Sequence, residues 1–123
     1  MDKKKILIVD DEVNFCNLVK KNLEGTGEFE VSVATKGKDG IQMAKEIKPD
    51  LVLLDIVMPE MDGGDVAGAI RGDKDIKDTP VVFLTSIVRE NEDGSPIKGY
   101  PVLAKTVTMQ EFLACIRENI KQF

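Results

Sequence analysis

The sequence predicts an α/β domain with a doubly wound, five-stranded parallel sheet in the strand order 2-1-3-4-5. Four short runs are apolar throughout, as strands of a parallel sheet covered on both faces require; they are residues 6–9, 51–54, 81–84 and 102–104. A fifth run, residues 29–34, alternates apolar with polar residues and is expected at a sheet edge. Helical patterns separate the runs, and right-handed crossovers between parallel strands then give the doubly wound class.

Apolar residues recur at helical spacing in four segments, which we interpret as helices packed on the sheet. They are a helix that begins near Glu12, one around residues 41–47, one around residues 66–70 and one over residues 109–120. Glycines near residue 25 end the first helix, and Pro49 stops the second. Gly68 weakens the third, because glycine disfavours helix interiors.

Length and composition indicate one domain, expected to span residues 1–123. The net charge of -5 disfavours direct binding to nucleic acid or to an anionic membrane surface. The apolar runs are far too short to span a bilayer. Cys16 and Cys115 lack the spacing of paired metal ligands and are expected to be free thiols, so a cytoplasmic location is the default expectation.

The absence of histidine restricts the chemistry of this chain. It excludes Ser-His-Asp and Cys-His catalysis, most zinc sites and a phosphohistidine on the chain itself. Any reaction here must therefore use carboxylates, hydroxyls and lysines.

Polar side chains follow the predicted strands at their carboxyl ends. These residues are Asp10, Asp11 and Glu12 after the first strand, Asp55 after the third, Thr85 and Ser86 after the fourth, and Lys105 after the fifth. Each has an ordinary explanation by itself, as a helix cap, a turn residue or a solvent-exposed lysine. Ligands of such sheets bind at the carboxyl ends of the strands, where the strand order reverses. We therefore expect these side chains to line one crevice.

Clustered carboxylates require a cation, because two of them about 5 Å apart repel by roughly 3 kcal/mol at an effective dielectric constant near 20. Lys105 supplies one positive charge, and carboxylate oxygens suit Mg²⁺. With both cations present, Asp55 becomes a candidate nucleophile toward a phosphoryl group. Thr85 would then donate a hydrogen bond to one of the transferred oxygens.

Four motifs occupy these strand ends: "IVDDE" at 8–12, "LLDIVMPEMDG" at 53–63, "FLTS" at 83–86, and Lys105. Together they resemble the receiver domain of bacterial two-component response regulators, over essentially the whole chain. The intervals also agree, with 44 residues from Asp11 to Asp55 and 30 from Asp55 to Thr85. The resemblance implies a flavodoxin-like, CheY-like fold. Gly63 is expected to shape the loop after Asp55.

The resemblance also implies a function. Asp55 would accept a phosphoryl group from the phosphohistidine of a sensor histidine kinase or phosphotransfer protein, and Lys105 would pair with the phosphorylated side chain. Asp10, Asp11 and Asp55 would hold Mg²⁺ directly or through water, with the backbone carbonyl of Val57 as a further ligand. Such a chain signals to a downstream protein target. It is not an enzyme with an external substrate, and only self-phosphorylation and slow autodephosphorylation are expected of it.

The sequence departs from the family in three places. Thr106 follows Lys105, where receivers have a proline after a cis bond; a cis bond without proline costs roughly 2.5–4 kcal/mol, so we expect a trans bond. Val102 replaces the aromatic residue three positions before the lysine, and Tyr100 is expected to face elsewhere. Residues 87–101 contain turn signals without a helical stripe, which predicts a loop or irregular hairpin, a shortened or lost fourth helix and an atypical output surface.

Other functions fit the sequence less well. A haloacid-dehalogenase-type phosphatase needs a second aspartate two residues after the nucleophile, where this chain has Val57. A flavin binder or a P-loop protein needs a glycine-rich or hydroxyl-rich phosphate loop, where this chain has the acidic residues 10–12. A degenerate receiver that acts as a constitutive binding module remains an alternative, because Val102 replaces the aromatic residue of the family. The intact acceptor, acid, hydroxyl and lysine positions argue against that reading.

Overall fold

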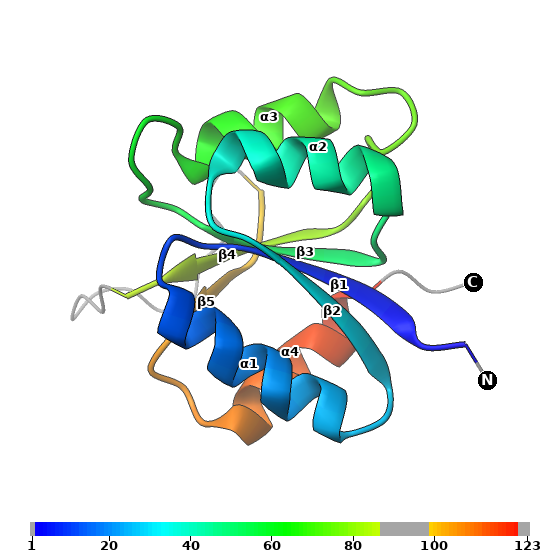
Figure 1. Cartoon of the computed structure of the whole chain (residues 1–123), viewed down its shortest axis with the longest axis vertical. Helices are drawn as coiled ribbons and strands as arrows, with labels where there is room; N and C mark the ends of the chain where they lie inside the picture. The colour runs from blue at the N-terminus through cyan, green and yellow to red at the C-terminus, as the bar shows by residue number, and fades with distance from the viewer. Residues whose placement is uncertain (1, 87–98, 121–123) are drawn as a thin grey trace.

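Five parallel strands form a single sheet in the order β2-β1-β3-β4-β5, as the sequence predicts (Figure 1). This computed structural model describes residues 2–86 and 99–120. The strands are β1 (Lys4–Val9), β2 (Phe29–Ala34), β3 (Leu51–Asp55), β4 (Val81–Thr85) and β5 (Val102–Ala104). β2 lies at an edge of the sheet, which agrees with its alternation of apolar and polar residues.

Helices cover both faces of the sheet, and residues 2–86 and 99–120 supply two to each side. They are α1 (Val13–Gly25), α2 (Gly37–Ile47), α3 (Gly63–Arg71) and α4 (Met109–Asn119). α1 and α4 pack on one face, and α2 and α3 on the other (Figure 1). None of these helices, which belong to the part of the chain that the structure describes, is long and apolar enough to cross a membrane.

The central strands are buried on both sides, which explains their continuous apolar runs. Ile6 and Ile8 of β1 belong to the layer under α1 and α4, whereas Leu7 and Val9 belong to the layer under α2 and α3. All four are fully buried. Burying one such side chain stabilises the fold by roughly 1.5–3 kcal/mol. The two layers therefore hold the carboxyl ends of the central strands in fixed positions.

Two of the sequence departures fall within the described residues. No peptide bond in residues 2–86 and 99–120 is cis, so the bond between Lys105 and Thr106 is trans, as expected. The expectation that Tyr100 faces elsewhere is wrong. Tyr100 packs against the same apolar layer as Val102, with its ring centroid 5.2 Å from that of Phe83. The reason is geometric, because residues two apart in an extended chain point to the same side.

The predicted loop or irregular hairpin between Ile87 and Pro101 falls largely on residues 87–98, which lie outside the described residues. The shortened or lost fourth helix therefore stays a prediction.

The start of α3 packs tightly against the carboxyl end of β3. The Gly63 N–H donates a hydrogen bond of 2.9 Å to the Ile56 carbonyl. A Cβ atom at Gly63 would lie only 2.4 Å from the Asp55 carbonyl oxygen. Only glycine permits this approach, so the sequence expectation that Gly63 shapes the loop after Asp55 has a steric basis.

We predict that Gly63→Ala destabilises the fold by about 1–3 kcal/mol, because the new methyl group would push the backbone of Asp55 aside. Gly68→Ala, in the same helix, is the matched control, since nothing lies within 4 Å of the added atom. The control should stabilise the fold by about 0.5–1 kcal/mol, the usual gain for alanine over glycine in a helix. Urea unfolding of both variants measures these changes, and equal effects would contradict the steric argument.

Candidate functional site

The carboxyl ends of the strands bring the sequence-predicted site residues to one edge of the sheet. Asp10 follows β1, Asp55 ends β3, Thr85 ends β4 and Lys105 follows β5. The backbone joins the last two, since the Lys105 N–H donates a hydrogen bond of 2.8 Å to the Thr85 carbonyl. Asp55 pairs in register with Leu84, the residue before Thr85. The parallel pairing of neighbouring strands therefore brings these residues to the same end of the sheet, as the sequence predicts.

Three acids in the crevice have the geometry of a possible cation site. Asp10, Asp11 and Asp55 each offer a carboxylate oxygen, and these oxygens lie within 4.8 Å of one another. Asp10 is fully buried, Asp55 is 6% exposed, and Asp11 is exposed and opens the cluster to solvent. Such hard oxygen donors, partly open to water, fit Mg²⁺ better than a softer metal.

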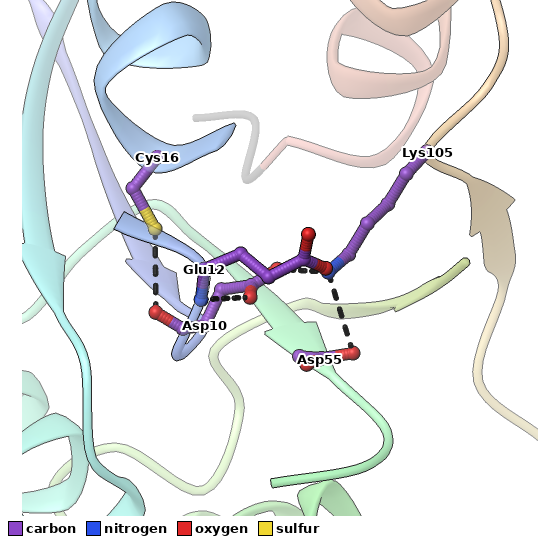
Figure 2. A network of polar contacts seen from close by, with 5 residues as sticks. All are labelled: Asp10, Glu12, Cys16, Asp55 and Lys105. Atoms are coloured by element: carbon purple, nitrogen blue, oxygen red, sulfur yellow. Dashed lines mark hydrogen bonds and ion pairs between the residues drawn. The ribbon is translucent and has the colours of Figure 1, made fainter. Parts of the chain in front are cut away.

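Lys105 is the cation that the structure places among these acids (Figure 2). Its Nζ atom lies 2.6 Å from Asp10 Oδ2 and 2.5 Å from Glu12 Oε1, but 3.7 Å from Asp55 Oδ1. The lysine side chain is only 6% exposed. Desolvation by burial would lower the pKa of Lys105, but hydrogen bonds to Asp10 and Glu12 outweigh that effect and raise it. The ammonium group therefore stays charged. It lies closer to Asp10 and Glu12, which follow β1, than to Asp55.

Asp10 is held rigidly by its neighbours. Its Oδ1 atom accepts a 2.9 Å hydrogen bond from the Glu12 N–H. The Cys16 thiol donates to the Asp10 backbone carbonyl at 3.3 Å, and burial raises the pKa of this thiol to about 12. Asp10 Oδ2 has the Lys105 ammonium, 2.6 Å away, as its one partner in the described part of the chain. A buried oxygen in this state is a ready ligand for a further cation.

The environment of Asp55 disfavours its ionised form. Desolvation by burial, followed by repulsion from Asp10, raises the pKa of the Asp55 carboxyl from 3.8 to about 6. Lys105 and a hydrogen bond from the Val57 backbone lower it, but not enough to offset burial. The Val57 side chain itself is 70% exposed beside the crevice. A cation added at the acids would favour the ionised carboxylate.

Sequence reasoning missed two contacts of Lys105. Glu12 was recognised as an acid after the first strand, but nothing in the sequence indicates that it binds Lys105. Phe15 fitted the apolar stripe of the first helix, yet its ring centroid lies 4.8 Å from Lys105 Nζ. The sequence offers one signal for these contacts, which is that an acid and an aromatic residue stand shortly after the acidic pair.

The chain matches the family model described as response regulator receiver domain over residues 6–117. It is 32% identical over 120 residues to the DNA-binding dual master transcriptional regulator RpaA of Synechocystis sp., covering 96% of this chain and 49% of that protein. It is 39% identical over 83 residues to the alkaline phosphatase synthesis transcriptional regulatory protein PhoP of Bacillus subtilis, covering 68% and 33%. The chain thus spans half or less of the length of these curated relatives.

Solved structures agree with the fold. The chemotaxis protein CheY4 of Vibrio cholerae superposes with a TM-score of 0.84 at 25% identity, covering 97% of this chain and 100% of that chain. The receiver domain of a sensor histidine kinase from Pseudomonas aeruginosa has a TM-score of 0.82 at 21% identity, covering 95% and 97%. That second structure has a magnesium ion coordinated in its active site cleft. At 21% identity, the similarity between the two chains shows a shared fold alone.

We predict that Asp55→Asn, in the presence of a chelator at pH 7.5, raises the free energy of unfolding by about 1–3 kcal/mol. The pKa of the Asp55 carboxyl is about 6 in the folded state, whereas an ordinary carboxyl of this kind has a pKa of 3.8. The folded state therefore binds this proton at a higher pH than the unfolded state does. The wild type should therefore gain stability as the pH falls from about 6 to about 4, and the advantage of the variant should vanish over that window.

Urea unfolding of both proteins at pH 4, 5, 6 and 7.5 measures this difference. Asp78→Asn, at an exposed position, is the matched control for loss of a surface carboxylate. A stability difference between Asp55→Asn and wild type that does not vary with pH would contradict the prediction.

Proposed function

The chain belongs to the response regulator receiver domain family, and from this premise we propose that Asp55 accepts a phosphoryl group from the phosphohistidine of a partner protein. A receiver domain is a signalling domain of a two-component response regulator. The observation that carries the proposal is the position of Asp55. Its carboxylate is nearly buried at the end of β3, beside the oxygens of Asp10 and Asp11 and 3.7 Å from the Lys105 ammonium.

In the proposed transfer, an Asp55 carboxylate oxygen forms a bond to phosphorus while the bond between phosphorus and the donor imidazole nitrogen breaks. The electron pair of the broken bond returns to the imidazole. Because these 123 residues contain no histidine, the phosphohistidine donor lies outside them, on a histidine kinase or phosphotransfer protein. With its pKa raised to about 6, the Asp55 carboxyl is still mostly ionised at neutral pH, as a nucleophile must be.

The donor set at the crevice fits Mg²⁺. Asp10, Asp11 and Asp55 would hold the ion directly or through water, with the Val57 carbonyl as a further ligand. When bound, Mg²⁺ supplies positive charge to the carboxylates and to the phosphoryl oxygens. Lys105 would pair with a phosphoryl oxygen, and the Thr85 hydroxyl would donate a hydrogen bond to another. These groups also allow self-phosphorylation from a small phosphoryl donor and slow autodephosphorylation, in which water attacks phosphorus and restores the carboxylate.

Signalling would follow from the added charge. A phosphoryl group brings close to two negative charges to the crevice, which biases an equilibrium between two conformations and changes the affinity for a downstream protein. We assign residues 1–123 to one receiver domain. Some relatives are named as DNA-binding regulators, and in a longer protein of that kind we assign nucleic acid binding to other segments, given the charge of -5 here. The free thiols of Cys16 and Cys115 support a cytoplasmic location.

We predict that incubation with acetyl phosphate and Mg²⁺ adds one phosphoryl group to the wild type and none to Asp55→Asn. Intact mass measurement detects the adduct, and Asp78→Asn should be labelled like the wild type. An unlabelled wild type, with a known receiver labelled in parallel, would favour the constitutive binding module. A labelled Asp55→Asn would place the acceptor elsewhere.

We also predict that Asp11→Asn weakens Mg²⁺ binding by about tenfold or more, because loss of one charged ligand in a small carboxylate cluster removes a large share of the attraction. Since Asp11 is exposed, the stability of the fold should change little. Calorimetric titration with Mg²⁺ measures the affinity. An unchanged affinity would remove Asp11 from the ligand set.

A further inference from the structure

The Lys105 ammonium lies closer to Glu12 and Asp10 than to Asp55. The lysine ammonium is 2.5 Å from Glu12 and 2.6 Å from Asp10, more than 1 Å nearer than its 3.7 Å distance from Asp55 (Figure 2). The carboxylate that the proposed function would phosphorylate is therefore the most distant of the three partners. A phosphoryl group on Asp55 would therefore have to attract the ammonium away from two nearer partners.

We propose that Glu12 is a positioning residue that holds Lys105 in the unphosphorylated site and competes with the phosphoryl group on Asp55 for its ammonium. This inference rests on the proposed function, and it concerns how the same site is regulated. Glu12 would stabilise the resting arrangement, and phosphorylation would succeed only when the phosphoryl oxygens attract Lys105 more strongly than Glu12 does.

Glu12 is suited to release the lysine, whereas Asp10 is not. The Glu12 side chain is 55% exposed, so water can solvate its carboxylate when Lys105 leaves. Asp10 is fully buried and would keep an uncompensated charge unless another cation replaced Lys105. Glu12 is therefore the exchangeable partner of the lysine.

The Glu12 carboxylate does not cap the helix that it precedes. Glu12 occupies the N-cap position of α1, but its side chain makes no capping hydrogen bond to the first turn of this helix, which the structure describes completely. Its backbone N–H is bound to Asp10 Oδ1, which fixes the starting point of the side chain. A change of the carboxylate alone should therefore leave α1 intact.

Phe15 defines the path of the lysine side chain. Its ring packs against Phe112 with centroids 6.2 Å apart and lies 4.8 Å from the Lys105 Nζ. This contact keeps the ammonium at the α1 side of the crevice, within reach of Glu12, through the attraction of a cation to an aromatic face. The lysine can exchange partners by a short movement of its end, because Asp55 Oδ1 is already within 3.7 Å.

The charges of Glu12 and of the phosphoryl group determine which of them attracts Lys105 more strongly. A phosphoryl group carries close to two negative charges, so it attracts Lys105 more strongly than the single charge of Glu12 does. Replacing Glu12 with glutamine removes the competitor and keeps the side-chain shape. Because one partner of this ion pair is more than half exposed, the shift in the equilibrium should be modest, about two- to fivefold.

The test uses beryllofluoride, a phosphoryl mimic, titrated into the full chain at saturating Mg²⁺ and followed by NMR. Glu12→Gln should bind it about two- to fivefold more tightly than the wild type. Glu60→Gln is the matched control, since this exposed glutamate lies in the loop after Asp55 and its loss changes the net charge equally. An affinity unchanged in Glu12→Gln, or raised as much in Glu60→Gln, would overturn the proposal.

A second measurement examines the resting site without Mg²⁺ or beryllofluoride. NMR of the Lys105 ammonium should show faster hydrogen exchange with water in Glu12→Gln and an unchanged rate in Glu60→Gln. An unchanged rate in Glu12→Gln would overturn the proposal. A wild type that fails to bind beryllofluoride contradicts the proposed function, and the competition fails with it. A wild type that binds beryllofluoride, with an unaffected Glu12→Gln, contradicts only the role of Glu12.

Discussion

The arrangement of this molecule depends on the burial of two carboxylates beside an apolar core. Asp10 and Asp55 end strands that are otherwise buried on both sides, and neither can be solvated fully by water. Such charges destabilise a fold unless a cation lies close to them. The buried ammonium of Lys105 meets part of this requirement, and the three carboxylate oxygens lie close enough together to hold a divalent ion that would meet the rest. The phosphoryl transfer that we propose would add further negative charge to this same cluster.

The sheet supplies the rigid part of this site. β1 and β3 lie between two apolar layers, and their parallel register brings Asp10 and Asp55 to the same edge. Gly63 lets the start of α3 pack directly on the backbone of Asp55. Because interiors of this kind are closely packed, the acids can move little relative to one another. A change in charge among these acids must therefore be expressed by less tightly held groups, which in the described part of the chain include the exposed Glu12 carboxylate and the end of Lys105.

Two of the departures from the family pattern lie in β5 or next to it. Lys105 and Thr106 are joined by a trans bond, and the lysine nevertheless reaches the acids. Val102 stands where receivers usually have an aromatic residue, while Tyr100, two residues earlier on the same side of the chain, packs on Phe83 and under the Arg71 guanidinium. An aromatic ring is thus retained in this apolar layer, at the amino end of β5. Phosphorylation-linked movement cannot depend on an aromatic side chain at position 102.

The sequence by itself determined the class of the fold, the strand order and the set of polar residues in the crevice. These features follow from local patterns: continuous apolar runs require burial on two faces, alternation at residues 29–34 requires an edge, and acids placed directly after strands must meet at one end of a parallel sheet. Only the tertiary structure decided that Lys105 binds Glu12 and Asp10 more closely than Asp55, that Phe15 lies beside its ammonium, and that burial raises the pKa of Asp55. Glu12 and Lys105 are 93 residues apart in the chain. Their contact depends on side-chain directions and local burial, which no periodicity in the sequence records.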